Sequence, residues 1–179
     1  MVTMPEPDTH IDPREVKFDS LLRYNEQETA HWREWFGKHP DAVLQIPAGD
    51  SSLGMGTLRD LLFHIQIVEW VYAKVLHGEN WEGEWQKLDR STVAGIFAIG
   101  AEAQQKLRAF ADSATEEQLA RPYKLTSGRG QTVSGSGRKF LIHVLLHSIR
   151  HWAQVAVLLR QQGHATDWQH DFVFCDAID

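Results

Sequence analysis

Cysteine is nearly absent from this chain: Cys175 is the only one among 179 residues. A single thiol cannot form a disulfide within the chain, so the fold must be held together without a covalent cross-link. Such low cysteine usage is typical of a reducing compartment, and we therefore expect a cytoplasmic protein.

Long apolar runs and clusters of positive charge are missing as well. No stretch approaches the roughly 20 apolar residues that span a membrane, and residues 1–13 lack the charged-then-apolar pattern of a secretion signal. The formal net charge is −6, and the positive residues are scattered. Because binding to nucleic acid requires a positive surface, we expect neither a nucleic-acid partner nor a membrane partner.

The remaining composition is that of an ordinary globular protein. Apolar residues make up 42% of the chain and charged residues 23%, which is sufficient for a hydrophobic core. The length fits one domain, which we expect to cover residues 1–179. Seven tryptophans and ten histidines are many for this length. Tryptophan side chains fill cores and line pockets, whereas histidine side chains bind protons and metal ions.

Four long segments have the apolar periodicity of amphipathic helices, and strand-like alternation is nearly absent. The predicted helices cover residues 12–38, 57–77, 91–111 and 139–162, with a short helical turn over 115–120 and a long loop, which could contain a small hairpin, over 121–138. The linkers between the first and second helices and between the third and fourth are longer than a minimal up-down bundle needs. This pattern predicts an all-α fold, an antiparallel four-helix bundle with long crossover loops.

Helix-capping residues support these boundaries. Asp12 precedes a proline and is a suitable first cap, and Thr57 is followed three residues later by Asp60, which resembles a capping box. Gly78 and Gly163 follow the last periodic residues of the second and fourth helices, where glycine commonly ends a helix.

The fourth predicted helix contains a ladder of histidines, HVLLHSIRH, over residues 143–151. At about 100° per residue, His147 lies about 40° and His151 about 80° from His143, with Gln154 near 20°. The arginines and lysine of this helix, Arg150 among them, lie between roughly 220° and 340°. We therefore expect the histidines to face the interior and the cations to face water.

The second predicted helix has one histidine, His64, in the middle of its apolar stripe. Two histidines four residues apart on a helix can bind one ion, but His143 and His151 are separated by a rise of about 12 Å and cannot share one. A metal site would therefore combine His64 with one adjacent pair, and the spacing leaves open whether the pair is 143/147 or 147/151. Alternatively, each histidine is a hydrogen-bonded core residue.

The segments LRDLLFHI and HVLLHSIRHWAQVAVLLRQQG resemble the DinB/YfiT-like family of bacterial metal-dependent proteins. The family pattern has one histidine in the first segment and His-x-x-x-His, commonly followed by Arg-Gly-Gln, in the second. The resemblance covers nearly the whole chain, including the tail DWQHDFVFCDA. In this sequence Trp152-Ala153 stands where the family has Arg-Gly, and Arg150 precedes His151 instead.

This resemblance implies an antiparallel bundle, often a homodimer, with a divalent metal held by three histidines. Carried over by position, the metal ligands are His64, His147 and His151, and Gln154 lies three residues after the last of them. His143 is then a pocket residue or a hydrogen-bonding partner of a ligand. Imidazole ligands suit several divalent metals, and we expect Zn or Ni ahead of Fe or Mn.

Three neutral ligands leave an open coordination position, which marks catalytic rather than structural metal sites. HSIRH lacks the glutamate of the HExxH motif, so peptidase chemistry is not expected. Asp60 could orient a ligand or simply cap its helix. Glu69 lies about 140° from His64, which predicts a surface or inter-helix charge.

These observations favour a metal-dependent enzyme that acts on a small molecule, either a hydrolase or a transferase that uses a low-molecular-weight thiol. The thiol mechanism is implied by the resemblance, because the family includes thiol-dependent enzymes. The alternative is a metal- or ligand-binding protein of the same fold without turnover, for instance in a stress response. A third interpretation is a bundle whose histidines are only structural.

Overall fold

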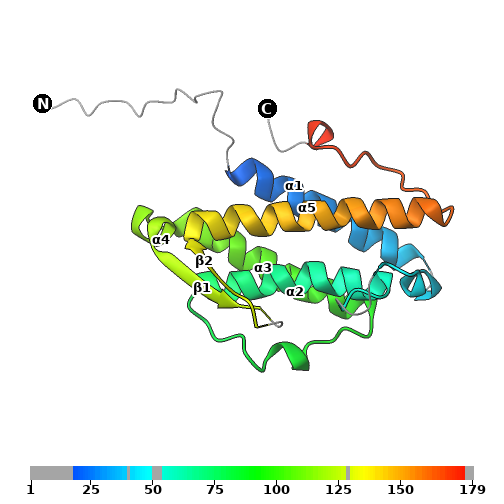
Figure 1. Ribbon diagram of the computed structural model, residues 1–179. Coiled ribbons are helices and arrows are strands. Elements are labelled where there is room, and N and C mark those ends of the chain that lie inside the picture. The colour runs from blue at the N-terminus through cyan, green and yellow to red at the C-terminus, as the bar shows by residue number, and fades with distance from the viewer. Residues whose placement is uncertain (1–17, 40, 50–53, 128–129, 176–179) are drawn as a thin grey trace, which may run out of the picture.

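The computed structural model describes residues 18–39, 41–49, 54–127 and 130–175 and is mostly helical (Figure 1). The four long helices are α1 (Phe18–Lys38), α2 (Leu58–Leu76), α3 (Val93–Ser113) and α5 (Gly137–Gln161). The smaller elements are the helix α4 (Glu116–Ala120), the strands β1 (Pro122–Thr126) and β2 (Thr132–Ser136), and the 3₁₀ turns η1 (Asp41–Gln45), η3 (Trp85–Lys87) and η4 (Phe172–Phe174).

The predicted bundle of four helices is confirmed, and so is the hairpin in the Gly- and Ser-rich segment, where β1 pairs with β2 in antiparallel register. Thr57 and Asp60 form the capping box of α2, since each side chain bonds to the backbone N–H of the other residue. Gly78 and Gly163 adopt φ angles of 69° and 79° just after α2 and α5, as expected of helix-ending glycines. The cap predicted at Asp12 lies outside the described residues.

The packing and direction of the helices decide which of their faces meet in the interior. α2 packs against α3 and α5, and α1 packs against the same two helices from the other side. α1 runs in the same direction as α5, and α2 runs in the same direction as α3 (Figure 1). The segment after α2 therefore crosses the whole length of the bundle before α3 begins. This crossover lies in a different connection from the two linkers whose length stood out in the sequence.

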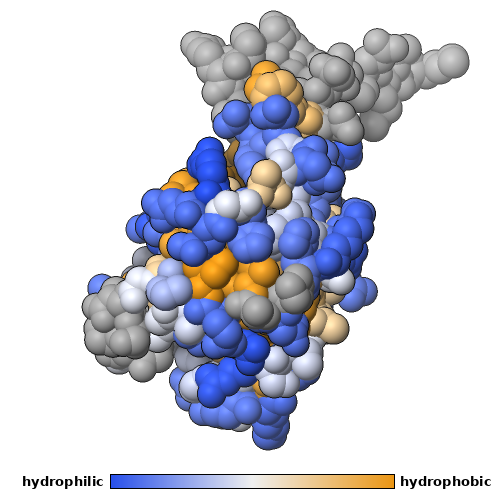
Figure 2. Space-filling view, turned by 90° about the vertical axis from the view of Figure 1, so that its right-hand side faces the viewer, coloured by the Kyte–Doolittle hydropathy of each residue, from blue (hydrophilic) through white to orange (hydrophobic). Residues whose placement is uncertain are grey.

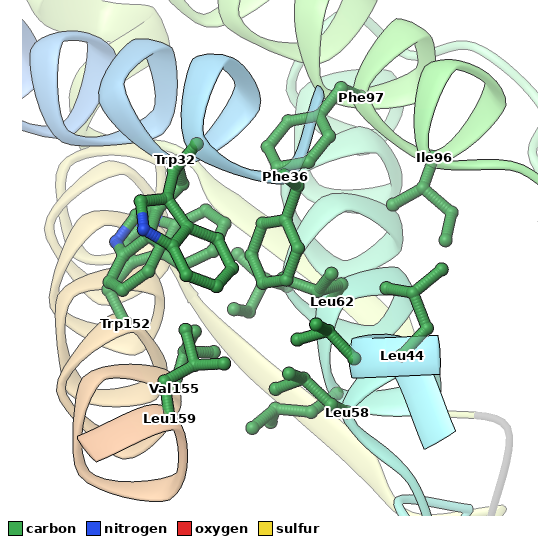
Figure 3. Close-up of a cluster of buried hydrophobic side chains, with 14 residues drawn as sticks. Trp32, Phe36, Leu44, Leu58, Leu62, Ile96, Phe97, Trp152, Val155 and Leu159 are labelled. Atoms are coloured by element: carbon green, nitrogen blue, oxygen red, sulfur yellow. The ribbon is translucent and has the colours of Figure 1, made fainter. Parts of the chain in front are cut away.

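Two large apolar clusters fill the two ends of the interior, and a smaller third cluster contains Trp70, Ile99 and Ala103. The first is centred on stacked aromatic rings: Trp152 lies 5.7 Å from Trp32 and 6.2 Å from Phe97, measured between ring centroids (Figure 3). The second is built from the opposite ends of the helices, with Tyr72 on Phe140 at 5.0 Å. Trp32 and Trp152, both at most 2% exposed, therefore belong to the core.

Buried polar residues separate the two apolar clusters. They occupy the middle of each contributing helix: Asn25, Glu28 and Thr29 on α1, Gln66 and Glu69 on α2, and His147, Ser148 and His151 on α5. Removing polar groups from water is unfavourable unless they find partners, so a polar layer at this depth is a feature that the fold must stabilise with hydrogen bonds.

The C-terminal segment turns back from the end of α5 and lies along α1 (Figure 1). Glu28, which is 4% exposed, accepts hydrogen bonds from Trp168 Nε1 at 3.0 Å and from His170 Nδ1 at 2.6 Å. Hydrophilic residues cover most of the end of the bundle at which α1 and α5 finish, with hydrophobic residues visible between them (Figure 2). No helix in the described part of the chain is both long and apolar enough to cross a membrane.

Candidate metal centre

The histidines predicted as metal ligands come from two neighbouring helices. His147 and His151 are one turn apart on α5, and His64 faces them from α2, which packs antiparallel to α5. One ligand nitrogen from each of the three rings lies within 4.8 Å of the other two. The structure thus brings together the three residues that the family resemblance implied as ligands, in a geometry that could hold a metal ion.

The distances fit a common ion. His64 Nε2 lies 3.1 Å from His147 Nε2, and the ring centroids of His147 and His151 are 4.4 Å apart. Two nitrogens bound to one tetrahedral zinc at about 2.0–2.1 Å would lie roughly 3.3 Å apart. The observed spacing is therefore close to the spacing that an ion would impose.

Burial favours the neutral form of the His147 and His151 rings. His147 is 8% exposed, and the loss of solvent, followed by the nearby rings of His151 and His64, lowers its pKa to about 2. Burial also lowers the pKa of His151, partly offset by its hydrogen bond to Gln154. Since only the neutral imidazole has a lone pair for a metal, these rings are ready to bind a cation without first losing a proton.

Gln154 fixes the orientation of one ligand. Its Oε1 lies 2.6 Å from His151 Nδ1, and because a carbonyl oxygen only accepts, Nδ1 carries the proton. The lone pair of His151 is consequently on Nε2, which points to the other rings. Second-layer hydrogen bonds of this kind hold metal-binding histidines in place in many proteins. Gln154 therefore lies beside the three rings and contacts one of them directly.

His143 lies at the edge of the centre. The expectation that the whole ladder faces inward is wrong for this residue, which is exposed. Its ring packs against Tyr72 at 5.3 Å and lies 6.0 Å from the ring of His147. Partial burial lowers its pKa, with further contributions from the charges of Arg150 and Lys139. His143 is therefore a neutral imidazole beside the three rings.

Asp60 serves as a helix cap. Its Oδ2 accepts hydrogen bonds from Thr57 N at 3.0 Å and from Thr57 Oγ1 at 2.8 Å. The cap fixes the first turn of α2, and Asp60 lies one turn before His64 on that helix. Its alternative role, orienting a ligand ring, stays a prediction.

Arg150 lies closer to the centre than its helical position predicted. Its Nη2 lies 3.4 Å from His151 Nε2, the nitrogen that carries the lone pair. The angular estimate grouped this residue with the solvent-facing cations, although at 340° it is only about 20° from His143. Long arginine side chains extend well away from their own backbone, and this one bends toward the rings.

Of the two positions predicted for Glu69, at the surface or between helices, the structure has the second, since its side chain bonds to residues of α1 and α5. Glu69 is fully buried rather than at the surface, and its Oε1 accepts hydrogen bonds from Asn25 Nδ2 at 2.7 Å and Ser148 Oγ at 2.6 Å. Burial raises the pKa of Glu69 to about 7, against the effect of these two hydrogen bonds. Small polar residues inside apolar helix faces, such as Ser148 beside His147, are the signal that could have indicated this group.

The residues present fit a divalent metal. The group contains three imidazoles and, among the described residues, no carboxylate or thiol joins it. His147 Nδ1 is buried without a hydrogen-bond partner in the part of the chain that the structure describes. The polar contact of this ring is made by its other nitrogen, Nε2, which faces His64 Nε2. Three imidazole nitrogens are a protein donor set of catalytic metal sites, in which the fourth position is left to water or substrate.

Comparisons with known proteins agree with this arrangement. YfiT from Bacillus subtilis, described as a probable metal-dependent hydrolase with an unusual four-helix bundle topology, has the same fold, with a TM-score of 0.60 and 18% sequence identity over 90% of this chain and 95% of YfiT. The uncharacterized protein YjoA of Bacillus subtilis (strain 168) is 30% identical over 105 residues, which are 59% of this chain and 66%, just under two thirds, of YjoA. The model of the DinB family matches residues 12–174, and the chain therefore belongs to the DinB family.

Proposed function

We propose that this protein is a metal-dependent enzyme that acts on a small molecule through His64, His147 and His151. The observation that carries the proposal is the convergence of three imidazole nitrogens, all within 4.8 Å of one another, from two helices. Placing these rings together costs free energy, because the buried rings of His147 and His151 lose most of their hydration.

A divalent ion held there would act as a Lewis acid and lower the pKa of a water or thiol at its open position. The residues around the rings orient the ligands. Gln154 holds His151 with its lone pair toward the centre, and the buried first turn of α2 holds His64. His143 lies exposed beside the ring of His147, where it can contact a molecule that enters from solvent.

Two reaction classes suit this arrangement: hydrolysis, and transfer of a low-molecular-weight thiol to an electrophile. The likeness to YfiT, itself described as a probable metal-dependent hydrolase, supports the first class. The second is supported by the absence of a carboxylate from the group in the described residues. Thiols ionise more easily than water and need a weaker base.

Metal loading is the first test. Metal-free protein is dialysed against zinc or nickel, and the bound metal is counted by elemental analysis. We expect one ion per chain, with Zn or Ni bound ahead of Fe or Mn, and loss of that ion in His64→Ala. His77→Ala is the matched control, because His77 is an exposed histidine just after the same helix. Fewer than about 0.1 ion per chain would leave the histidines with a structural role only.

Turnover is the second test. Loaded protein is screened with activated esters and amides, and with electrophiles in the presence or absence of small thiols. Metal-dependent product formation that is lost in His64→Ala supports an enzyme, and dependence on thiol selects the transferase. Full loading without turnover would favour the alternative, a non-catalytic metal- or ligand-binding protein, for instance of a stress response.

The same proposal includes a homodimer in the cytoplasm, with a small molecule rather than a membrane or nucleic acid as its ligand. The outer face of α5 carries exposed apolar residues at helical spacing, with Ile142, Leu146 and Val157 exposed by 39%, 54% and 42%. A two-fold axis near the middle of α5 would set this stripe against itself. Sedimentation analysis should give a dimer for the natural chain and a monomer for Leu146→Glu; a natural chain that sediments as a monomer would contradict it.

A further inference from the structure

The side chain of Arg150 interacts with the atom that a metal would use. Its Nη2 lies 3.4 Å from His151 Nε2, while His151 Nδ1 is engaged by Gln154. A guanidinium group only donates, so Arg150 donates to the lone pair of His151 Nε2. A metal ion and Arg150 therefore compete for one lone pair, and metal binding must displace the guanidinium from it.

The displaced guanidinium would remain next to the centre, because its side chain is anchored one residue before His151. The guanidinium already lies against the ring group: its Nη2 is 3.4 Å from His151 Nε2, and the ring of His147 is 4.4 Å from that of His151 between centroids. The ring group itself includes no carboxylate among the described residues.

These charges leave the loaded centre strongly positive. Three neutral imidazoles do not offset the charge of a divalent ion, and Arg150 adds another positive charge at the edge. The side chain is exposed and no carboxylate is bonded to it among the described contacts, whereas Arg108 and Arg138 are each paired with acidic residues. Such an arrangement favours a ligand that brings negative charge to two points.

We propose that Arg150 and the metal centre together bind a small molecule with two anionic groups, one of which binds the ion while a carboxylate or similar oxyanion pairs with the guanidinium. This inference rests on the proposed function and specifies its substrate class. Arg150 is then a specificity-determining residue: it selects anionic substrates over neutral ones of the same size. Its fork of N–H donors matches a carboxylate in a way that a lysine does not.

Cobalt-loaded protein tests this directly, because thiolate binding to cobalt changes its absorption spectrum. The probes are 3-mercaptopropionate, which carries a carboxylate, and 2-mercaptoethanol, which is similar in size and uncharged. We expect the natural chain to bind the first at least about tenfold more tightly. In Arg150→Gln the ratio should fall to about one or two, and Arg150→Lys should recover part of it. Arg160→Gln, an exposed arginine at the end of the same helix, should leave the ratio unchanged.

Metal affinity supplies a second measurement, in which Arg150→Gln should strengthen binding of the metal while it weakens the preference for the anionic thiol. Because Arg150 competes with the ion and repels it, Arg150→Gln should bind cobalt about three- to tenfold more tightly in the absence of thiol. A purely structural role would weaken both kinds of binding together. Equal ratios in the natural chain and Arg150→Gln, or weaker cobalt binding by the variant, would overturn the inference while leaving the metal centre intact. A natural chain that binds no cobalt would instead refute the metal centre itself, and this inference with it.

Discussion

Glu69→Gln probes the buried acid behind the centre. The carboxyl group is fully buried, and its Oε1 accepts hydrogen bonds from Asn25 and Ser148. Glutamine has the same length, and its amide oxygen can accept the same two bonds. The substitution therefore removes the ability to ionise and changes little else in the packing.

The expected difference in the free energy of unfolding follows from the pKa of Glu69, which burial raises from 4.5 to about 7. The folded protein holds a proton there between these two pH values and the unfolded chain does not. The stabilisation is full below pH 4.5 and is lost as the pH rises through 7. A shift of about 2.5 pH units corresponds to about 3 kcal/mol. Glu69→Gln should therefore match the natural chain near pH 5 and exceed its stability by up to about 3 kcal/mol at pH 8.

Urea unfolding of the metal-free proteins at pH 5 and pH 8 measures this difference. Thermal unfolding gives a second measurement of the same difference, because in a chain of this size 3 kcal/mol corresponds to a rise of roughly 6–12 °C in Tm. The histidines whose pKa values burial lowers destabilise both proteins equally in acid, so their effect cancels in the comparison. Glu117→Gln, on the exposed side of α4, is the control and should follow the natural chain. Parallel stability curves for Glu69→Gln and the natural chain would refute the reasoning, since Glu69 would then ionise normally in the fold.

Three further substitutions test separate parts of the structure. Gln154→Ala removes the hydrogen bond that orients His151 and should weaken metal binding about 10- to 100-fold in a competition titration, with the metal-free Tm unchanged. Trp152→Ala removes a side chain that is 2% exposed and should lower the free energy of unfolding by about 3–5 kcal/mol; a loss below 1 kcal/mol would contradict the packing. Thr57→Ala removes the capping bond to Asp60 and should lower the free energy of unfolding by about 1 kcal/mol in urea.

The helices and the inward direction of His64, His147 and His151 could be predicted because they depend on local periodicity, whereas the choice of His147 and His151 as the ligand pair came from the family resemblance. Residues four apart on a helix must lie side by side, so His147 and His151 had to be neighbours. His64 lies inside an apolar stripe, which could only face another helix. The caps at Thr57 and Gly78 depend on a few adjacent residues, and the structure has both.

The remaining features depend on how the helices are arranged around one another. The local sequence of residues 77–92 does not predict that this segment crosses the bundle and makes α2 parallel to α3. The burial of Glu69 follows from its two partners, Asn25 and Ser148, which are 44 and 79 residues away in the sequence. Arg150 is exposed as expected, but the contact of its guanidinium with His151 could not be predicted, because helical angles locate the Cβ atom and not the end of a long side chain.

X-ray absorption spectroscopy of the zinc-loaded protein tests the metal centre most directly, because it reports which atoms surround the ion. We predict one zinc per chain with three imidazole nitrogens at about 2.0–2.1 Å and a further light-atom ligand, and one fewer imidazole for whatever zinc remains in His64→Ala. Zinc surrounded by oxygen alone, or an identical spectrum in the natural chain and His64→Ala, would contradict the account.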